Sequence, residues 1–171
     1  MSKMEEAVPA GPVLALAKRL KTQIESLGAR VEICGSLRRE RPLVKDIDLI
    51  TNLSTWKVTE HLGEYIDYIG LVYTQTSCGN KRLSAMIGQM PFQIIVIPEE
   101  SWGAGLLHAT GSKLFNILLR YRAKEQGMKL NQYGLYCSGE MVASKTEEQI
   151  MQVLGYSFIP PQNRDKGLFK I

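Results

Sequence analysis

The expected fold of this chain follows from two stretches, Cys34-Gly35-Ser36-Leu37-Arg38-Arg39 and Asp46-Ile47-Asp48-Leu49-Ile50. In the second stretch carboxylates alternate with apolar residues, which is the pattern of a strand with one face in a core. Residues two apart on a strand point to the same face, so Asp46 and Asp48 are expected to project together. Two parallel carboxylates are a ready site for a hard divalent cation such as Mg²⁺.

The glycine-serine turn before this strand is suited to binding phosphate. Its backbone N–H groups and the Ser36 hydroxyl are donors, and Arg39 can add charge-assisted hydrogen bonds to β- and γ-phosphates. An acidic pair alone is most often simply solvated, but metal and phosphate sites together indicate nucleotidyl transfer. Asp46 and Asp48 would share two magnesium ions, one carrying a triphosphate and one lowering the pKa of an attacking 3′-hydroxyl.

The composition is that of an ordinary globular protein with a modest basic excess. The 171 residues contain 21 Lys and Arg against 17 Asp and Glu, a formal net charge of +4. A solvated basic surface would explain this excess without any ligand. Two clusters nevertheless favour a polyanion passing the acidic pair. They comprise Arg38, Arg39, Arg41 and Lys45, and then Lys113, Arg120, Arg122, Lys124 and Lys129.

Three scattered cysteines, Cys34, Cys78 and Cys137, indicate a reducing compartment and neither a disulfide framework nor a zinc cluster. No apolar run approaches the roughly 18 residues of a membrane span. Residues 1–12 lack the apolar core of a signal peptide and are expected to be a short flexible lead. We therefore expect an intracellular, soluble protein that is cytoplasmic or nuclear, with a viral source also open.

The pattern up to Ala109 predicts a mixed sheet with helices on one face, an α+β layer. Apolar residues at helical spacing predict helices over 13–27 and 56–66 and another after Pro98. Alternating or β-branched runs predict strands at 30–34, 46–51, 69–76, 82–87 and 92–97.

Thr110-Gly111-Ser112 breaks this pattern and separates 13–109 from a smaller α+β region, 110–171. A helix is expected over 112–126, and short strands on either side of 131–134. Thr146 is a candidate N-cap of a last helix, with Gln149 in the capping-box place. Pro160-Pro161 is expected to end the ordered part.

Three polar residues around the break are candidates for a ligand cleft. His108 directly precedes it, and a structural and a functional role are equally open for this side chain. Asn116 and Arg120 lie four residues apart on the next helix, so both could face the same cleft.

Taken together, these residues resemble the family X DNA polymerases, the group of DNA polymerase beta and small bacterial and viral repair polymerases. The similarity runs from about Val13 to Gly167. Besides the two opening stretches it is carried by the following segments: 98–104 (PEESWGA), 110–113 (TGSK), 130–136 (LNQYGLY), 146–148 (TEE), 154–155 (LG) and 159–161 (IPP).

The resemblance implies a nucleotidyltransferase palm over 13–109 followed by a thumb-like, nucleotide-selecting subdomain over 110–171. It implies that Asp46 and Asp48 are catalytic ligands of two Mg²⁺ or Mn²⁺ ions. Residues expected to bind the nucleotide are Gly35, Ser36, Arg39, Lys45, His108, Ala109, Gly111 and Asn116. Lys113 and Arg120 are expected to contact DNA, and DNA and nucleoside triphosphates are the implied partners of a monomer.

Three positions depart from the family pattern. The third catalytic aspartate is expected on the strand that runs into Pro98, where this chain has Gln93. A glutamine can ligate Mg²⁺ through its amide oxygen but cannot accept a proton at neutral pH. Lys45 replaces a frequent glycine, and Ala109 replaces a frequent aromatic residue, which leaves more room beside the sugar.

Three functions remain open on these residues. The first is a DNA-directed, repair-type nucleotidyltransferase weakened by Gln93. The second is an inactive pseudo-polymerase that binds nucleotide or DNA ends. The third is nucleotidyl transfer to a non-DNA acceptor, because one fold can host many acceptors.

Overall fold

The computed structural model describes residues 6–165, which form two compact units. The first contains residues up to 37 and 41–96, and the second contains 38–40 and residues from 97 onward. The second unit thus begins after Val96, ahead of the 109/110 boundary expected from the sequence. The reason is that helix α4, Trp102–Thr110, packs against elements of the second unit, and the side chain of Ile97 covers its Gly105.

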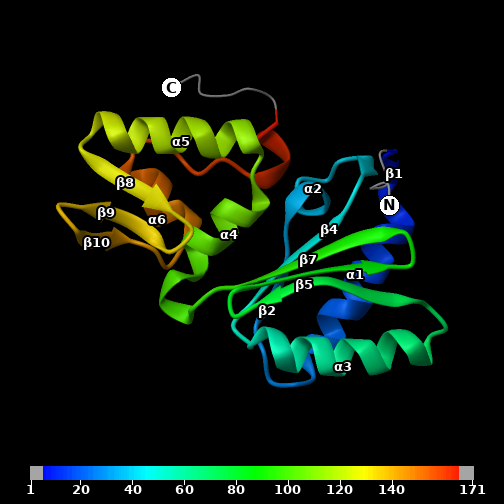
Figure 1. Ribbon diagram of the computed structural model, residues 1–171. Helices are drawn as coiled ribbons and strands as arrows, with labels where there is room; N and C mark the ends of the chain where they lie inside the picture. The colour runs from blue at the N-terminus through cyan, green and yellow to red at the C-terminus, as the bar shows by residue number, and fades with distance from the viewer. Residues whose placement is uncertain (1–5, 166–171) are drawn as a thin grey trace. The chain divides into compact units, whose positions relative to one another are not determined.

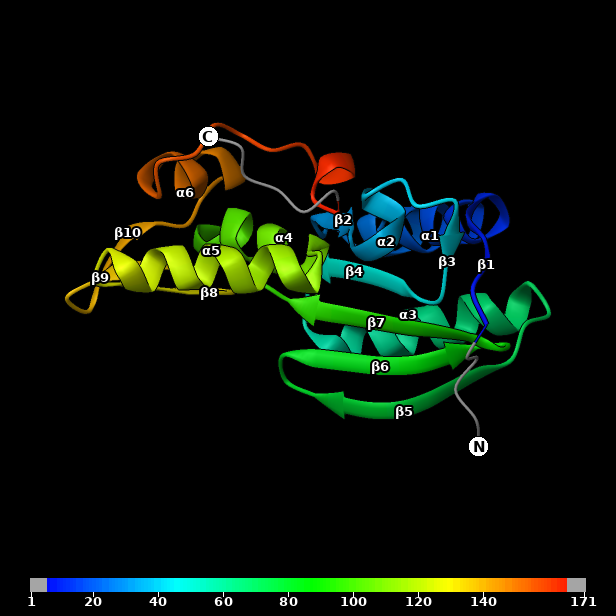
Figure 2. The same cartoon turned by 90° about the horizontal axis from the view of Figure 1, so that it is seen from above.

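The first unit is a mixed five-stranded sheet with two helices on one face (Figures 1 and 2). The strands, in sheet order, are β2 Val31–Ile33, β4 Ile47–Thr51, β7 Met90–Val96, β6 Arg82–Ile87 and β5 Tyr73–Gly79. Among the described strands of this sheet, β4 and β7 pair in parallel and the other neighbours are antiparallel. Helices α1 Ala10–Glu25 and α3 Thr55–Tyr68 pack against each other and bury the apolar side of the sheet. The α+β class predicted from the sequence is confirmed.

Residues 6–12 differ from the flexible lead expected over 1–12. Strand β1, Val8–Pro9, pairs with β3, Leu43–Val44, and α1 already begins at Ala10. The Ala10 N–H donates to the Pro42 carbonyl at 3.0 Å, and Val44 is buried, so this segment is held by hydrogen bonds and by the core. Residues 1–5 lie outside the described part of the chain.

The second unit combines three helices with a three-stranded antiparallel sheet. Its helices are α4, which follows a 3₁₀ turn at Glu99–Ser101, α5 Lys113–Glu125 and α6 Glu147–Val153. Its strands, in sheet order, are β10 Glu140–Ala143, β9 Gly134–Cys137 and β8 Met128–Asn131. The Thr146 hydroxyl caps α6 by accepting from the Gln149 N–H at 3.1 Å, as the sequence predicted. Strand β10 was not predicted.

The prediction that order ends at Pro160-Pro161 is wrong. A 3₁₀ turn at Pro161–Asn163 follows, and the next residue, Arg164, is only 1% exposed. Its guanidinium pairs with Glu147, and this contact holds the segment in place. Within residues 6–165, no helix has both the length and the apolar character needed to cross a membrane.

The contact between α4 and the start of α6 leaves no room for a side chain at Gly103. A Cβ there would lie 2.3 Å from backbone atoms of Thr146. We expect Gly103→Ala to lower the free energy of unfolding by about 1–3 kcal/mol, the usual cost of overpacking. Denaturant unfolding would measure it. Gly63→Ala is the matched control, because a Cβ at this position in α3 meets only Tyr73 at 4.0 Å. An equally unstable control would contradict the steric explanation.

Candidate active site

The parallel pair of strands β4 and β7 places Gln93 directly beside Asp48. These two residues are register partners, and Gln93 pairs with Ser84 of β6 on its other side. Their neighbours Ile47, Leu49, Phe92 and Ile94 are buried, so Asp48 and Gln93 lie on the face of the sheet opposite the apolar core. Asp46 comes directly before β4 and has the same parity as Asp48. The Gln93 amide donates to the Ser84 hydroxyl at 3.4 Å.

Gly35 is required by the close approach of Asp48. Its φ of +58° is in the left-handed region, and a Cβ at this position would lie 2.2 Å from Oδ2 of Asp48. The Cys34 N–H also donates to the backbone oxygen of Asp48 at 2.8 Å. The predicted glycine-serine turn is a short helix, α2 Gly35–Arg38, which begins against the acidic strand.

Ser36 is a candidate anion ligand. Its hydroxyl oxygen is buried and has no hydrogen-bond partner within residues 6–165. A buried hydroxyl without a partner is costly, so a native structure that keeps one calls for an explanation. A phosphate oxygen would satisfy it.

The donor set of Asp46, Asp48 and Gln93 suits a hard cation, because all three side chains offer oxygen. Residues 6–165 contain no group of three or more His, Cys, Asp or Glu side chains that could hold a metal ion. A site here would therefore consist of two carboxylates and one amide. That set fits Mg²⁺ or Mn²⁺ with one negative charge fewer than three carboxylates would provide.

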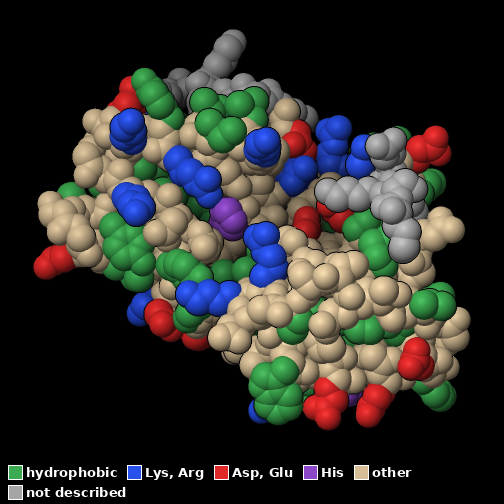
Figure 3. All heavy atoms as spheres, viewed as in Figure 1, with side chains coloured by type: hydrophobic (Ala, Val, Ile, Leu, Met, Phe, Trp, Pro, Cys, Tyr) green, Lys and Arg blue, Asp and Glu red, His purple; other side chains and the backbone are tan. Residues whose placement is uncertain are grey.

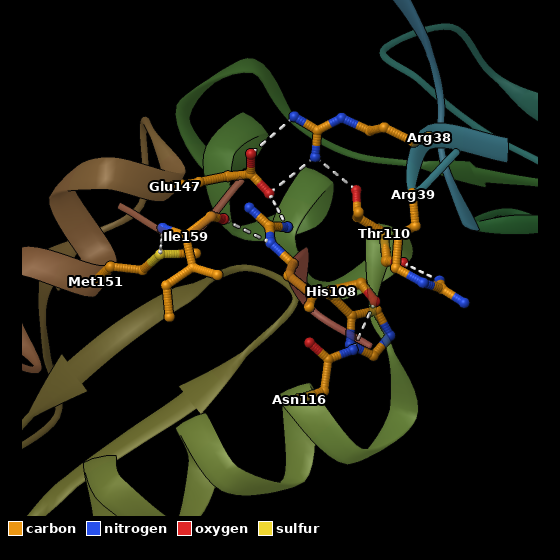
Figure 4. Close-up of polar contacts among 9 residues, drawn as sticks. Arg38, Arg39, His108, Thr110, Asn116, Glu147, Met151 and Ile159 are labelled. Atoms are coloured by element: carbon orange, nitrogen blue, oxygen red, sulfur yellow. Dashed lines mark hydrogen bonds and ion pairs between the residues drawn. The ribbon is translucent and has the colours of Figure 1, made fainter. Parts of the chain in front are cut away.

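Arg39 belongs to the second unit and is held by two acceptors. Its Nε donates to Oδ2 of Asp165 at 2.9 Å. Its Nη1 donates to the carbonyl of Thr110, as Figure 4 shows. The adjacent Gly111 has a φ of +71°, and a Cβ there would lie 3.3 Å from Nη1 of Arg39. Gly111 thus lets this arginine lie against the end of α4.

A cluster of charges formed by Arg38, Glu147 and Arg164 was not found by sequence reasoning. Glu147, at the first position of α6, accepts from Arg38 and from Arg164 (Figure 4). Burial alone would raise the pKa of Glu147, but the hydrogen bonds and charges of both arginines outweigh it and hold that pKa below its usual range. Burial lowers the pKa of Arg164, and Glu147 opposes this effect.

His108, Asn116 and Arg120 lie close together in the second unit. The Asn116 amide donates to the His108 carbonyl at 2.8 Å, and Nη2 of Arg120 lies 3.0 Å from Nδ1 of His108. All three line a small pocket together with Asn131. Ala109 is partly exposed at the end of α4.

The two lysines that are expected to contact nucleotide or DNA are exposed at the surface. Lys45 is exposed in the first unit, between β3 and β4, and Lys113 is exposed at the start of α5. Figure 3 shows Lys and Arg side chains gathered over α5. The predicted site residues divide between the two units. The first unit contains Gly35, Ser36, Lys45, Asp46, Asp48 and Gln93. The second unit contains Arg39, His108, Ala109, Gly111, Lys113, Asn116 and Arg120.

Comparison with known proteins identifies the family. The family described as "DNA polymerase beta thumb" matches residues 105–165. The repair DNA polymerase X of African swine fever virus (strain Badajoz 1971) is 30% identical over 148 residues, which cover 82% of this chain and 84% of that protein. The DNA polymerase/3′-5′ exonuclease PolX of Bacillus subtilis is 28% identical over 96% of this chain, which spans only 30% of that longer relative.

Solved structures show the same fold. Leishmania infantum polymerase beta in a ternary P/T complex matches with a TM-score of 0.81 at 24% identity, covering 95% of this chain and 78% of that one. The same polymerase in a ternary gap complex matches with a TM-score of 0.82 at 22% identity, covering 95% and 72%. Given the viral relative aligned over most of both proteins, this chain belongs to the family X DNA polymerases, a family of DNA nucleotidyltransferases.

Proposed function

We propose that this chain is a repair-type DNA polymerase that adds nucleotides to a DNA 3′ end with Mg²⁺ or Mn²⁺. The observation that carries the proposal is the pairing of the Asp46/Asp48 face with the Gly35-Ser36 turn, where the Ser36 hydroxyl is buried without a partner. The relative named repair DNA polymerase X supports it, as do the structures of Leishmania infantum polymerase beta in ternary P/T and gap complexes.

In this proposal each residue near the turn has one task. Ser36 donates its hydroxyl proton to a phosphate oxygen, and Arg39 donates charge-assisted hydrogen bonds to the β- and γ-phosphates. Asp46 and Asp48 bind the ions, with Gln93 contributing its amide oxygen. When bound, the ions neutralise phosphate charge and lower the pKa of the attacking 3′-hydroxyl. Gln93 cannot take the proton of that hydroxyl, because an amide is not a base at neutral pH.

The remaining assignments follow the two regions of the chain. Residues 13–109 act as the palm, and 110–171 as the thumb-like region that selects the nucleotide. His108, Ala109 and Gly111 lie along the sugar, and Asn116 reads the base. Lys113 and Arg120 contact DNA phosphates, which the basic surface over α5 supports. Lys45 adds positive charge near the triphosphate.

Extension of a gapped DNA by the purified chain tests the proposal. We expect slow incorporation of the templated nucleotide in Mg²⁺ and in Mn²⁺, and none when a chelator removes the metal. The reaction is followed by electrophoresis of a labelled primer at several enzyme concentrations. No extension in either metal at high enzyme concentration would contradict the claim of catalysis.

Gln93 favours one alternative, a pseudo-polymerase that binds nucleotide or DNA without turnover. That function predicts measurable nucleotide or DNA binding and no incorporation in either metal. It also predicts that Asp48→Ala changes these properties little. Transfer to another acceptor would instead appear as labelled product in a screen of RNA and protein acceptors.

A further inference from the structure

One carboxylate of the second unit lies between two guanidinium groups. Glu147 Oε1 and Oε2 accept from Nη1 and Nη2 of Arg38 at 3.0 and 2.8 Å, and Oε1 also accepts from Nη1 of Arg164 at 2.7 Å (Figure 4). The side chains of Glu147 and Arg164 are 4% and 0% exposed. None of these three groups has a task in the proposed reaction.

Burying such a cluster is costly, so it needs compensating contacts. Arg38 forms the bidentate fork, and the guanidinium carbon of Arg164 lies 5.1 Å and 5.8 Å from the ring centroids of Phe115 and Phe158. Glu147 also lies in the first turn of α6, where the helix dipole favours a negative charge. Nη2 of Arg164 is buried and has no hydrogen-bond partner within residues 6–165, and an apolar core would fill the same space at lower cost.

The cluster is connected to Arg39 from both sides. Arg38 precedes Arg39, and Arg164 precedes Asp165, the residue that accepts from Nε of Arg39 at 2.9 Å. Thr110 joins them, because its hydroxyl accepts from Arg38 at 2.7 Å and its carbonyl accepts from Arg39. The carbonyl of Arg164 accepts from the Ser112 hydroxyl at 3.1 Å, which ties this segment to the start of α5.

We infer that Glu147 is a positioning residue for the triphosphate: by holding Arg38 and Arg164 it fixes the plane in which Arg39 presents its guanidinium. This inference rests on the proposed role of Arg39. A planar fork with Nε and Nη1 both bound keeps a single orientation, which is what a bidentate phosphate contact requires. Without Glu147, Arg38 and Arg164, the chain neighbours of the Arg39–Asp165 pair, lose the carboxylate that joins them.

The test is direct binding of dATP and dAMP in Mg²⁺, measured by calorimetry. Glu147→Gln removes the central charge. Arg38→Gln removes the contacts of the Arg38 guanidinium with Glu147 and Thr110 and keeps the Glu147–Arg164 pair, so it remains informative if Glu147→Gln does not fold. Glu148→Gln is the matched control, because Glu148 is the next residue of α6 and is exposed.

We expect dATP binding to weaken about tenfold to a hundredfold in both test variants, the loss of a charge-assisted hydrogen bond. Binding of dAMP, which lacks the β- and γ-phosphates, should change less than about twofold. The KM for dATP in gap filling should rise while kcat at saturation changes less. A purely structural role would weaken both nucleotides equally.

The outcomes separate this inference from the proposed function. If the wild type binds no dATP, the assignment of the site fails, and the inference with it. If the wild type binds dATP and Arg38→Gln binds it equally well, the inference is overturned while the proposed function stands. A loss in Glu148→Gln as large as in the test variants would also overturn it.

Discussion

Replacing Gln93 with aspartate is expected to raise the rate of DNA extension about a hundredfold to a thousandfold. Gln93 is the register partner of Asp48 and lies on the same face of the sheet, so an aspartate there adds a third carboxylate to the proposed metal-binding set. It also supplies a group that can accept the proton of the 3′-hydroxyl, which an amide cannot. Preorganised charge at a reacting centre is typically worth a rate factor of about 10²–10³. Single-turnover gap filling would measure it.

Gln93→Asn is the matched control for this gain. It shortens the side chain as aspartate does and keeps the neutral amide, so its rate should equal or fall below that of the wild type. The hydrogen bond from Gln93 to Ser84 is long, at 3.4 Å, and its loss should cost little stability. Equal rates for the wild type and Gln93→Asp would contradict the proposed metal site. If neither extends DNA, the binding function gains support.

The arrangement around Asp48 was largely predictable because local pattern determines it. Alternation of acidic and apolar residues indicates the face of β4, and apolar runs beside Gly88 and Pro98 indicate β7. The parallel pairing of β4 with β7 is not encoded in either strand alone, since it depends on which strands become neighbours. The role of Gln93 as the third ligand remains a prediction.

The C-terminal contacts could not be read from the sequence. Pro160-Pro161 resembles the end of a fold, and Glu147 resembles an ordinary charged residue at a helix start. The role of Glu147 depends on a partner that is distant in the chain, because Arg38 lies 109 residues before it. Strands β1 and β3, at two residues each, are too short to produce a periodic signal.

Removing the buried carboxylate by Glu147→Ala is expected to lower the free energy of unfolding by about 3–5 kcal/mol at pH 7, the usual cost of breaking one side of a buried ion pair. The reason is that Arg164 would remain buried without its counter-ion, facing a second positive charge on Arg38. Urea unfolding followed by circular dichroism would measure the loss. Glu148→Ala, which truncates the exposed neighbour, should change stability by less than about 0.5 kcal/mol.

The pH dependence of this loss in the free energy of unfolding shows how much of it comes from the charge of Glu147. Because the folded pKa of Glu147 is held below its ordinary value of 4.5, its contribution is fully present above about pH 4.5 and is lost as pH falls through the lower folded pKa. The wild type should therefore lose stability at acid pH more steeply than Glu147→Ala. The gap between the two should be widest near neutrality and narrow below about pH 4.5. A gap that stays constant from pH 7 to pH 3 would mean that packing, rather than the charge of Glu147, stabilises this part of the fold.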